Sequence, residues 1–326
     1  MSFFGLEVYF YPVLEFINGF INSYGITVIL FTLFIKLLTV PFDIKTRQST
    51  RKMQILQPEI DAINKKYEND PDRKNAKMME LYKREKYNPL SGCLPLLLSM
   101  PILFLLLAVL RYTAAQEMKK LYDIVVLANQ TGDFSGFHQF MASNRFLWIG
   151  NLWQPDTLFM PAGSIIPSAD QAKSLGLIIE NGQFVQETYV SQMGPLLNSL
   201  AEMQAAIDAG ETQLTQFLPY AQRTNGLFIL PILAGATSFL QSWVAQPKKN
   251  PNAAANQAAN TGKMMMYIFP VMSVWICSTS NSAFALYWTF SNIYAILLQL
   301  VLTYIYNKRD QAAVTNKPVP GMPNTY

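Results

Sequence analysis

The sequence predicts an all-α membrane protein with five transmembrane helices, a cytoplasmic helical hairpin and a small extracytoplasmic insertion. Of its 326 residues, 51% are hydrophobic and only 14% are charged, whereas soluble domains carry about 25% charged residues. Apolar stretches long enough to span a bilayer, about 17–25 residues each, recur along the chain. Lysine and arginine cluster at 43–87, directly after the first of these stretches, and such clusters mark the cytoplasmic side of a membrane.

Residues 1–24, which contain no Lys or Arg, are expected to form an amphipathic helix in the outer membrane interface. The lack of a basic segment argues against a signal peptide. A simple extension of the first span is the alternative, but Gly25 favours a break. Apolar residues recur there at helical spacing: Phe10, Val13, Leu14, Ile17, Phe20 and Ile21.

The first span, residues 25–42, carries a lysine within its apolar run. A lysine at membrane depth costs about 2.5–3.5 kcal/mol on insertion scales and normally faces protein or water. Either the Lys36 ammonium extends to the nearby interface, or it is a charge held in a hydrated cavity. Four polar residues at i, i+4, i+7 and i+11 share one helical face: Thr32, Lys36, Thr39 and Asp43.

Residues 43–93 are expected to form the cytoplasmic hairpin. Its first helix carries an apolar stripe made of Met53, Leu56, Ile60, Ile63 and Tyr67. Asp70 is predicted to cap the second helix, and Pro71 to occupy its first position. Two interpretations stay open for the hairpin: a solvated helical pair, or a docking surface for a partner or for anionic lipid headgroups.

The second span, residues 94–111, completes a distinctive order of motifs. A span with a central cation ends in Pro-Phe at 41–42, and Met-Gln-Ile-Leu-Gln-Pro-Glu follows at 53–59. Asn-Pro-Leu-Ser-Gly-Cys-Leu-Pro at 88–95 then precedes Met-Pro-Ile at 100–102. This order resembles the YidC/Oxa family of membrane-protein insertases. Similar matches occur at 146–156, 230–242 and 286–288, so the resemblance covers most of the chain outside one insertion.

Residues 112–225 are poor in Lys and Arg and are placed outside, with an inserted subdomain at about 157–224. The stretch at 146–156 resembles one that, in the family, leads almost directly into the third span. Within the insertion, 176–190 reads as a β-hairpin around the Asn-Gly turn at 181–182. A helix at 195–208, stopped by Gly210, follows it. A small folded subdomain is expected, with a mobile loop as the alternative.

Three further spans are predicted at 226–245, 263–277 and 283–306. Lysines place the linker 246–262 inside, residues 278–282 form an outer turn, and 307–326 is a cytoplasmic tail. In the third span Gln241 shares a face with small residues, which indicates close helix packing, a hydrated wall, or both. In the fifth span Asn292 and Gln299 share one face, where polar residues normally meet the interior of a bundle.

The resemblance implies an insertase and chaperone that moves transmembrane segments and short polar tails of clients into the bilayer through a hydrophilic, positively charged groove. It implies no enzymatic reaction, catalytic residue, cofactor or metal. Its partners would be nascent membrane proteins and lipid, with a Sec translocon and the ribosome as open possibilities and no sequence-specific nucleic acid. The location would be a bacterial plasma membrane, with the N-terminus outside and the C-terminus inside. The predicted groove residues are Lys36, Thr32, Thr39, Gln241, Asn292 and Gln299.

Two positions depart from the family pattern. Bacterial members usually carry arginine at the Lys36 position, and lysine loses its charge more readily than arginine when it is desolvated. Members usually carry glutamine at the position of Ser99, so one wall of the groove is less polar in this chain.

Other functions have less support. The chain has one histidine, His138, and two distant cysteines, Cys93 and Cys277, so a His-based zinc site, a Ser-His-Asp triad and a redox pair are not indicated. A small-solute or ion transporter using Lys36 as a binding charge is the alternative function. It would be favoured by inverted repeats with broken helices, which the sequence does not display. An integral scaffold with a dry interior around Lys36 is a third possibility.

Overall fold

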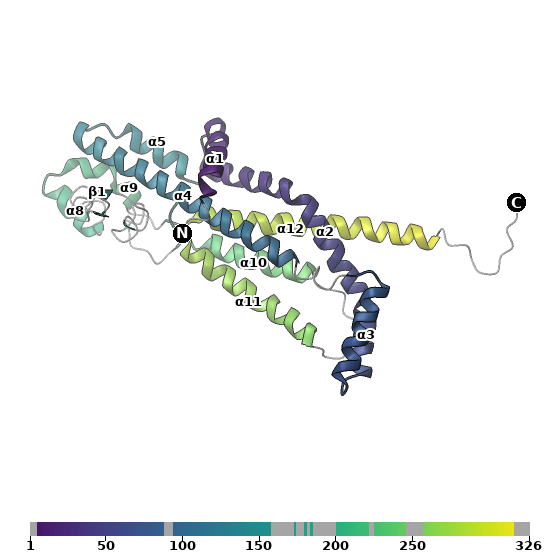
Figure 1. Ribbon diagram of the computed structural model, residues 1–326. Coiled ribbons are helices and arrows are strands. Elements are labelled where there is room, and N and C mark those ends of the chain that lie inside the picture. Colours follow the sequence, from purple (N-terminus) through teal and green to yellow (C-terminus); the bar gives the residue numbers. More distant parts are fainter. Residues whose placement is uncertain are drawn as a thin grey trace, which may run out of the picture.

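The computed structural model describes residues 5–87, 94–157, 173, 179–180, 183–184, 200–221, 225–245 and 257–315. These residues form helices and one short pair of strands (Figure 1). The elements, in order, are α1 (Glu7–Ile21), α2 (Tyr24–Lys66), α3 (Pro71–Arg84), α4 (Leu94–Thr131), α5 (Ser135–Asn144), β1 (Ile179–Glu180), β2 (Gln183–Phe184), α8 (Leu200–Asp208), the 3-10 helix η2 (Thr212–Gln216), α9 (Leu218–Ala221), α10 (Ile229–Ala245), α11 (Gln257–Thr279) and α12 (Ser282–Thr315).

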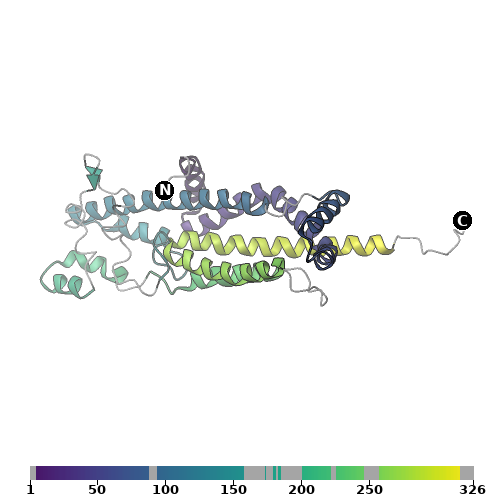
Figure 2. The same cartoon turned by 60° about the horizontal axis from the view of Figure 1, so that its bottom comes forward.

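The long helices α4, α10, α11 and α12 run along one direction in an elongated bundle (Figures 1 and 2). Three described segments are long and apolar enough to cross a membrane: Tyr24–Lys66, Met100–Thr131 and Ser282–Arg309. Two shorter apolar segments, Ile229–Ala245 and Met266–Thr279, accompany them. The prediction of an α-helical protein with apolar spans is therefore confirmed.

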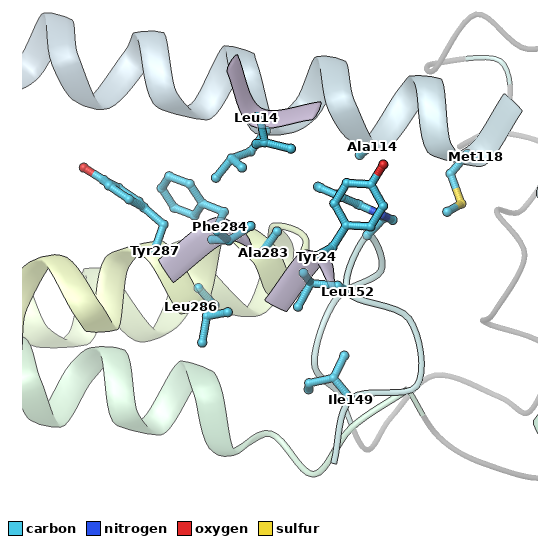
Figure 3. Close-up of a cluster of buried hydrophobic side chains, with 14 of the residues drawn as sticks. Leu14, Tyr24, Ala114, Met118, Ile149, Leu152, Ala283, Phe284, Leu286 and Tyr287 are labelled. Atoms are coloured by element: carbon cyan, nitrogen blue, oxygen red, sulfur yellow. The ribbon is translucent and has the colours of Figure 1, made fainter. Parts of the chain in front are cut away.

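The main core lies where α1, the start of α2, α4 and the start of α12 meet (Figure 3). Tyr24 stacks edge-on against Trp153, with ring centroids 5.1 Å apart. Outside this core, α12 exposes a series of large apolar residues along its length, as expected of a helix that faces lipid. They are Ile293, Leu297, Leu300, Val301, Tyr304 and Ile305.

The first predicted span and the first hairpin helix are one continuous element. The 43-residue helix α2 passes through Pro41 and Pro58 without ending, and α3 returns beside its last turns (Figure 1). The predicted cap is confirmed, because the side chain of Asp70 accepts a hydrogen bond from the backbone N–H of Arg73 at 3.0 Å. The predicted apolar stripe is confirmed except for Tyr67. The two hairpin helices pack together through the buried residues Leu56, Ile60, Leu81 and Tyr87 and the partly buried residues Met53, Ile63, Met78 and Tyr82.

The break between α1 and α2 falls at Asn22 and Ser23. Asn22 has a left-handed backbone conformation, φ 51°, and its N–H bonds to the carbonyl of Asn18 at 2.7 Å. Gly25, where the sequence suggested the break, lies inside α2. Gly25 allows the ring of Phe146 to lie close to the backbone of α2, since a Cβ at this position would overlap that ring.

Helix α4 continues to Thr131, beyond the predicted span, and α5 packs back against it. Within the insertion, β1 and β2 pair with Ile179 opposite Phe184 and Glu180 opposite Gln183, which confirms this part of the predicted hairpin. Helix α8 confirms the end of the predicted helix. The remainder of the 176–190 hairpin, residues 195–199, most of the linker 246–262 and the tail beyond 315 lie outside the described residues.

Candidate functional site

Lys36 lies on the side of α2 that faces α12. Leu37 and Leu38, the next two residues, are exposed, whereas Lys36 is half-buried and its Nζ lies 5.8 Å from the ring centroid of Tyr294. Further along, Arg51 lies 4.4 Å from the ring centroid of Tyr306. The contacts advance in the same order on both helices, so α2 and α12 run in parallel here.

Lys36 belongs to a row of charges on this face of α2. The hydroxyl of Thr39 lies 3.2 Å from the carbonyl oxygen of Lys36 and 3.4 Å from a carboxylate oxygen of Asp43. Asp43 interacts electrostatically with both Lys36 and Arg47. Arg47 donates to the carbonyl of Ala295 at 2.8 Å and to the side-chain oxygen of Gln299. We call Lys36, Thr39, Asp43, Arg47 and Tyr294 the cation cluster.

The structure does not bring all six predicted groove residues together. Lys36, Thr39 and Gln299 lie in or beside the cation cluster. Thr32 is fully buried on α2 and donates its hydroxyl to the carbonyl of Val28 at 2.7 Å. Gln241 is half-buried near the end of α10.

Asn292 lies in a separate polar network that joins α10, α11 and α12. It is 7% exposed and its amide donates to the hydroxyls of Ser238 at 2.9 Å and Thr237 at 3.1 Å. Trp288 also donates to Ser238, at 3.1 Å, and Ser238 lies 3.0 Å from the hydroxyl of Ser273. Buried polar groups satisfied in this way fix how neighbouring helices pack. Helix α10 therefore uses its small residues for close helix packing.

The cation cluster contains three residues that the sequence-based prediction of the groove did not include. Asp43 and Arg47 follow Lys36 at i+7 and i+11, so helical spacing alone places them on the same face. The sequence alone was therefore sufficient to place Asp43 and Arg47 on the face that carries Lys36. Tyr294 belongs to another helix, and no sequence pattern indicated that its ring would lie beside Lys36.

A second charged group anchors the start of α2. The hydroxyl of Tyr24 lies 2.8 Å from carboxylate oxygens of both Glu15 and Glu117, so it joins α2 to α1 and α4. Lys120 lies 2.5 Å from Glu117, which is only 2% exposed, and 3.4 Å from Glu15. Burying Glu117 is tolerable because it is paired with a cation and hydrogen-bonded. This anchor fixes the end of the helix that carries Lys36.

Asp156 fixes the start of α10. Its two carboxylate oxygens accept the backbone N–H groups of Phe228 and Leu230, each at 2.7 Å, and the indole N–H of Trp148 lies 3.3 Å away. The first N–H groups of a helix have no partner within the helix, so an acidic cap satisfies them and interacts well with the helix dipole. Gly226 is required nearby, because a Cβ there would overlap the Asp156 carboxylate.

The two ends of the insertion are joined to each other. The side chain of Asn225 donates to the carbonyls of Asn151, Gln154 and Pro155 at 2.8, 3.1 and 3.0 Å, and accepts the N–H of Asn151 at 2.6 Å. The chain thus leaves the bundle at 157 and returns to the same place at 225. Within the part of the chain that the structure describes, no group of three His, Cys, Asp or Glu side chains could hold a metal ion.

Sequence comparison with known proteins identifies the family of this chain. The model of the family described as 60Kd inner membrane protein matches residues 16–310, from within α1 to near the end of α12. The chain belongs to this family. Membership, together with the apolar helices, identifies a membrane protein.

Several curated relatives carry the name membrane protein insertase YidC. One from Clostridium perfringens is 38% identical over 160 residues, which cover 46% of this chain and 57% of that protein. One from Fusobacterium nucleatum is 27% identical over 282 residues, covering 86% of this chain and 87% of that protein. One from Leptospira interrogans is 26% identical over 286 residues, 87% of this chain. This chain spans only 32% of the Leptospira protein.

Proposed function

We propose that this protein inserts transmembrane segments and short polar tails of client membrane proteins into the bilayer, and assists their folding. The observation that carries the proposal is a family match over residues 16–310 in a chain that holds a half-buried lysine on an otherwise uncharged span. The family relatives named as insertases support it.

The chemistry of the cation cluster fits this task. A polar tail crossing hydrocarbon leaves its hydrogen-bonding groups unsatisfied, which is costly. A hydrated path along α2 and α12 would shorten the distance that the tail crosses in hydrocarbon, and Lys36 would attract an acidic residue of the tail. The apolar segment of the client would then move into lipid, driven by the hydrophobic effect. No covalent bond forms or breaks in this cycle, so the proposed activity is not enzymatic.

The decisive experiment reconstitutes the purified protein into liposomes and supplies a single-span client. We expect the translocated tail of the client to become protected from added protease, and empty liposomes to give no protection above background. If the protein-containing and empty liposomes protected the tail equally, the insertase proposal would be wrong. A transporter would instead be recognised by solute uptake without protection of a client.

We further propose that five helices cross the membrane with the N-terminus outside and the hairpin and C-terminus in the cytoplasm. Helix α10 has 17 residues, about 26 Å at 1.5 Å per residue, and α11 has 23, so both can cross a hydrocarbon core of about 30 Å with slight thinning for α10. The basic residues at 43–87 support a cytoplasmic hairpin.

Labelling of single cysteines in intact cells tests this topology. With Cys93 and Cys277 replaced, a cysteine at the exposed Asp133 should react with a membrane-impermeant maleimide. A cysteine at the exposed Lys77 should react only after the cells are broken. Rapid labelling at position 77 in intact cells would require the opposite orientation.

The insertion at 157–224 is expected to be dispensable for client insertion. Because Asn225 already holds the backbone of 151–155, a short Gly-Ser linker can replace residues 158–223 without moving Asp156 or α10. The shortened protein should insert clients at a rate within about twofold of the full chain, since segments whose ends lie close together tolerate such changes. The deletion also removes Phe217, which is buried against Phe134 and Phe137, so the shortened protein is first checked for correct folding. The assay is the same protease protection, and a folded but inactive deletion variant would show that the insertion takes part in the reaction.

A further inference from the structure

The hydroxyl of Tyr294 has no hydrogen-bond partner in the described part of the chain, although its oxygen is buried. Buried polar groups are nearly always paired, and an unpaired one is costly. A tyrosine hydroxyl in this position therefore calls for an explanation, because phenylalanine would fill the same space without the cost. Its environment provides one.

Tyr294 lies beside the charges of the cation cluster. The Lys36 ammonium is 5.8 Å from its ring centroid, and Asp43 and Arg47 both interact electrostatically with it. Arg47 is already engaged by Ala295 and Gln299 of α12. Lys36 and Arg47 carry two positive charges and Asp43 one negative charge, so the cluster as a whole holds one positive charge in excess.

We propose that Tyr294 and Lys36 together bind one carboxylate, that of an Asp or Glu in the client's translocated tail. This inference rests on the proposed function and adds a binding residue to it. A carboxylate accepts several hydrogen bonds, so it can take one from the Tyr294 hydroxyl and another from the Lys36 ammonium. Its single negative charge also balances the cluster. Hydrogen bonds to an ionised group are stronger than neutral ones, so the hydroxyl favours an acidic tail over its amide counterpart.

The test compares Tyr294→Phe with wild type in proteoliposomes, using two clients that differ only by Asp or Asn in the tail. We expect insertion of the Asp client to fall about three- to tenfold, as loss of a charge-assisted hydrogen bond predicts, and the Asn client to change less. Tyr304→Phe is the matched control, because Tyr304 lies on the same helix and is 69% exposed. It should leave both clients unchanged.

Thermal stability distinguishes client binding from a structural role. Removing an unpaired buried hydroxyl should leave the melting temperature of the purified Tyr294→Phe protein unchanged or raise it. A lower melting temperature with equal loss of both clients would mean that the hydroxyl is structural, which overturns the inference.

A comparison with Lys36→Ala separates this inference from the proposed function. If Lys36→Ala impairs the Asp client but Tyr294→Phe does not, the inference is wrong while the charge proposal stands. If wild type itself inserts neither client, the proposed function fails. When Lys36→Ala and Tyr294→Phe are combined, insertion of the Asp client should fall by less than the product of the two single losses, because both residues bind the same carboxylate.

Discussion

Replacement of Asp156 by alanine should destabilise the folded protein by about 3–4 kcal/mol, because one buried carboxylate satisfies several donors at once. The backbone N–H groups of Phe228 and Leu230 would lose their acceptor at the start of α10, in a site from which water is excluded. Asp156→Asn keeps one acceptor oxygen and should cost less. The measurement is the temperature at which the purified protein in detergent loses its monodisperse elution peak.

Asp133→Ala is the matched control for this prediction. Asp133 also accepts a backbone N–H at a helix start, that of Ser135 at 2.9 Å, but it is exposed to solvent. Its loss should cost at most about 1 kcal/mol, because an exposed hydrogen bond contributes little to stability. Equal effects of the two alanine variants would show that burial of the Asp156 cap contributes nothing.

Variants of Lys36 should change client insertion in the order Arg, Ala, Glu, from least to most impaired. Lys36→Arg keeps the charge in a similar volume and should retain activity. Lys36→Ala should lower insertion of clients with an acidic tail several-fold, since a partly hydrated ion pair contributes on the order of 1 kcal/mol. Lys36→Glu should lower it further through repulsion. The loss should be largest at low salt if ions enter the site.

The assay uses the paired Asp and Asn clients with equal amounts of each variant in proteoliposomes. Lys45→Ala is the matched control, because Lys45 is an exposed lysine on the same helix. Clients with neutral tails should respond less than acidic ones. Equal insertion of the Asp client by wild type and Lys36→Ala would favour the interpretation in which Lys36 only extends to the interface.

Features set by neighbouring residues were predictable from the sequence. The Asp70 cap with Pro71 behind it follows a local rule of helix starts, and the apolar stripe of the hairpin follows from helical periodicity. Helical spacing also placed Lys36, Thr39 and Asp43 on one face, as the contacts of Thr39 with its neighbours bear out.

Features set by contacts between distant segments were not predictable. The first span was predicted to end at residue 42, directly after Pro41, yet α2 continues through Pro41 to Lys66, because tertiary packing outweighs the local cost of a proline. Asp156 bonds to residues more than seventy positions away. Asn292 pairs with Ser238 of another helix. A single sequence contains no signal for such pairings, and the same holds for the ring of Tyr294 beside Lys36.

The anchor at Tyr24 has a consequence for the geometry of clients. Lys36 lies twelve residues after Tyr24 in an unbroken helix, which is about 18 Å at 1.5 Å per residue. In a hydrocarbon core of about 30 Å, with Tyr24 at the outer boundary, the ammonium would then lie about 12 Å from the cytoplasmic boundary. An extended tail covers that distance in about four residues at 3.3–3.6 Å each. Under the proposed topology and function, the protein sets the tail length at which an acidic residue first reaches Lys36. Clients with the acid closer to their membrane segment would meet the charge later during insertion.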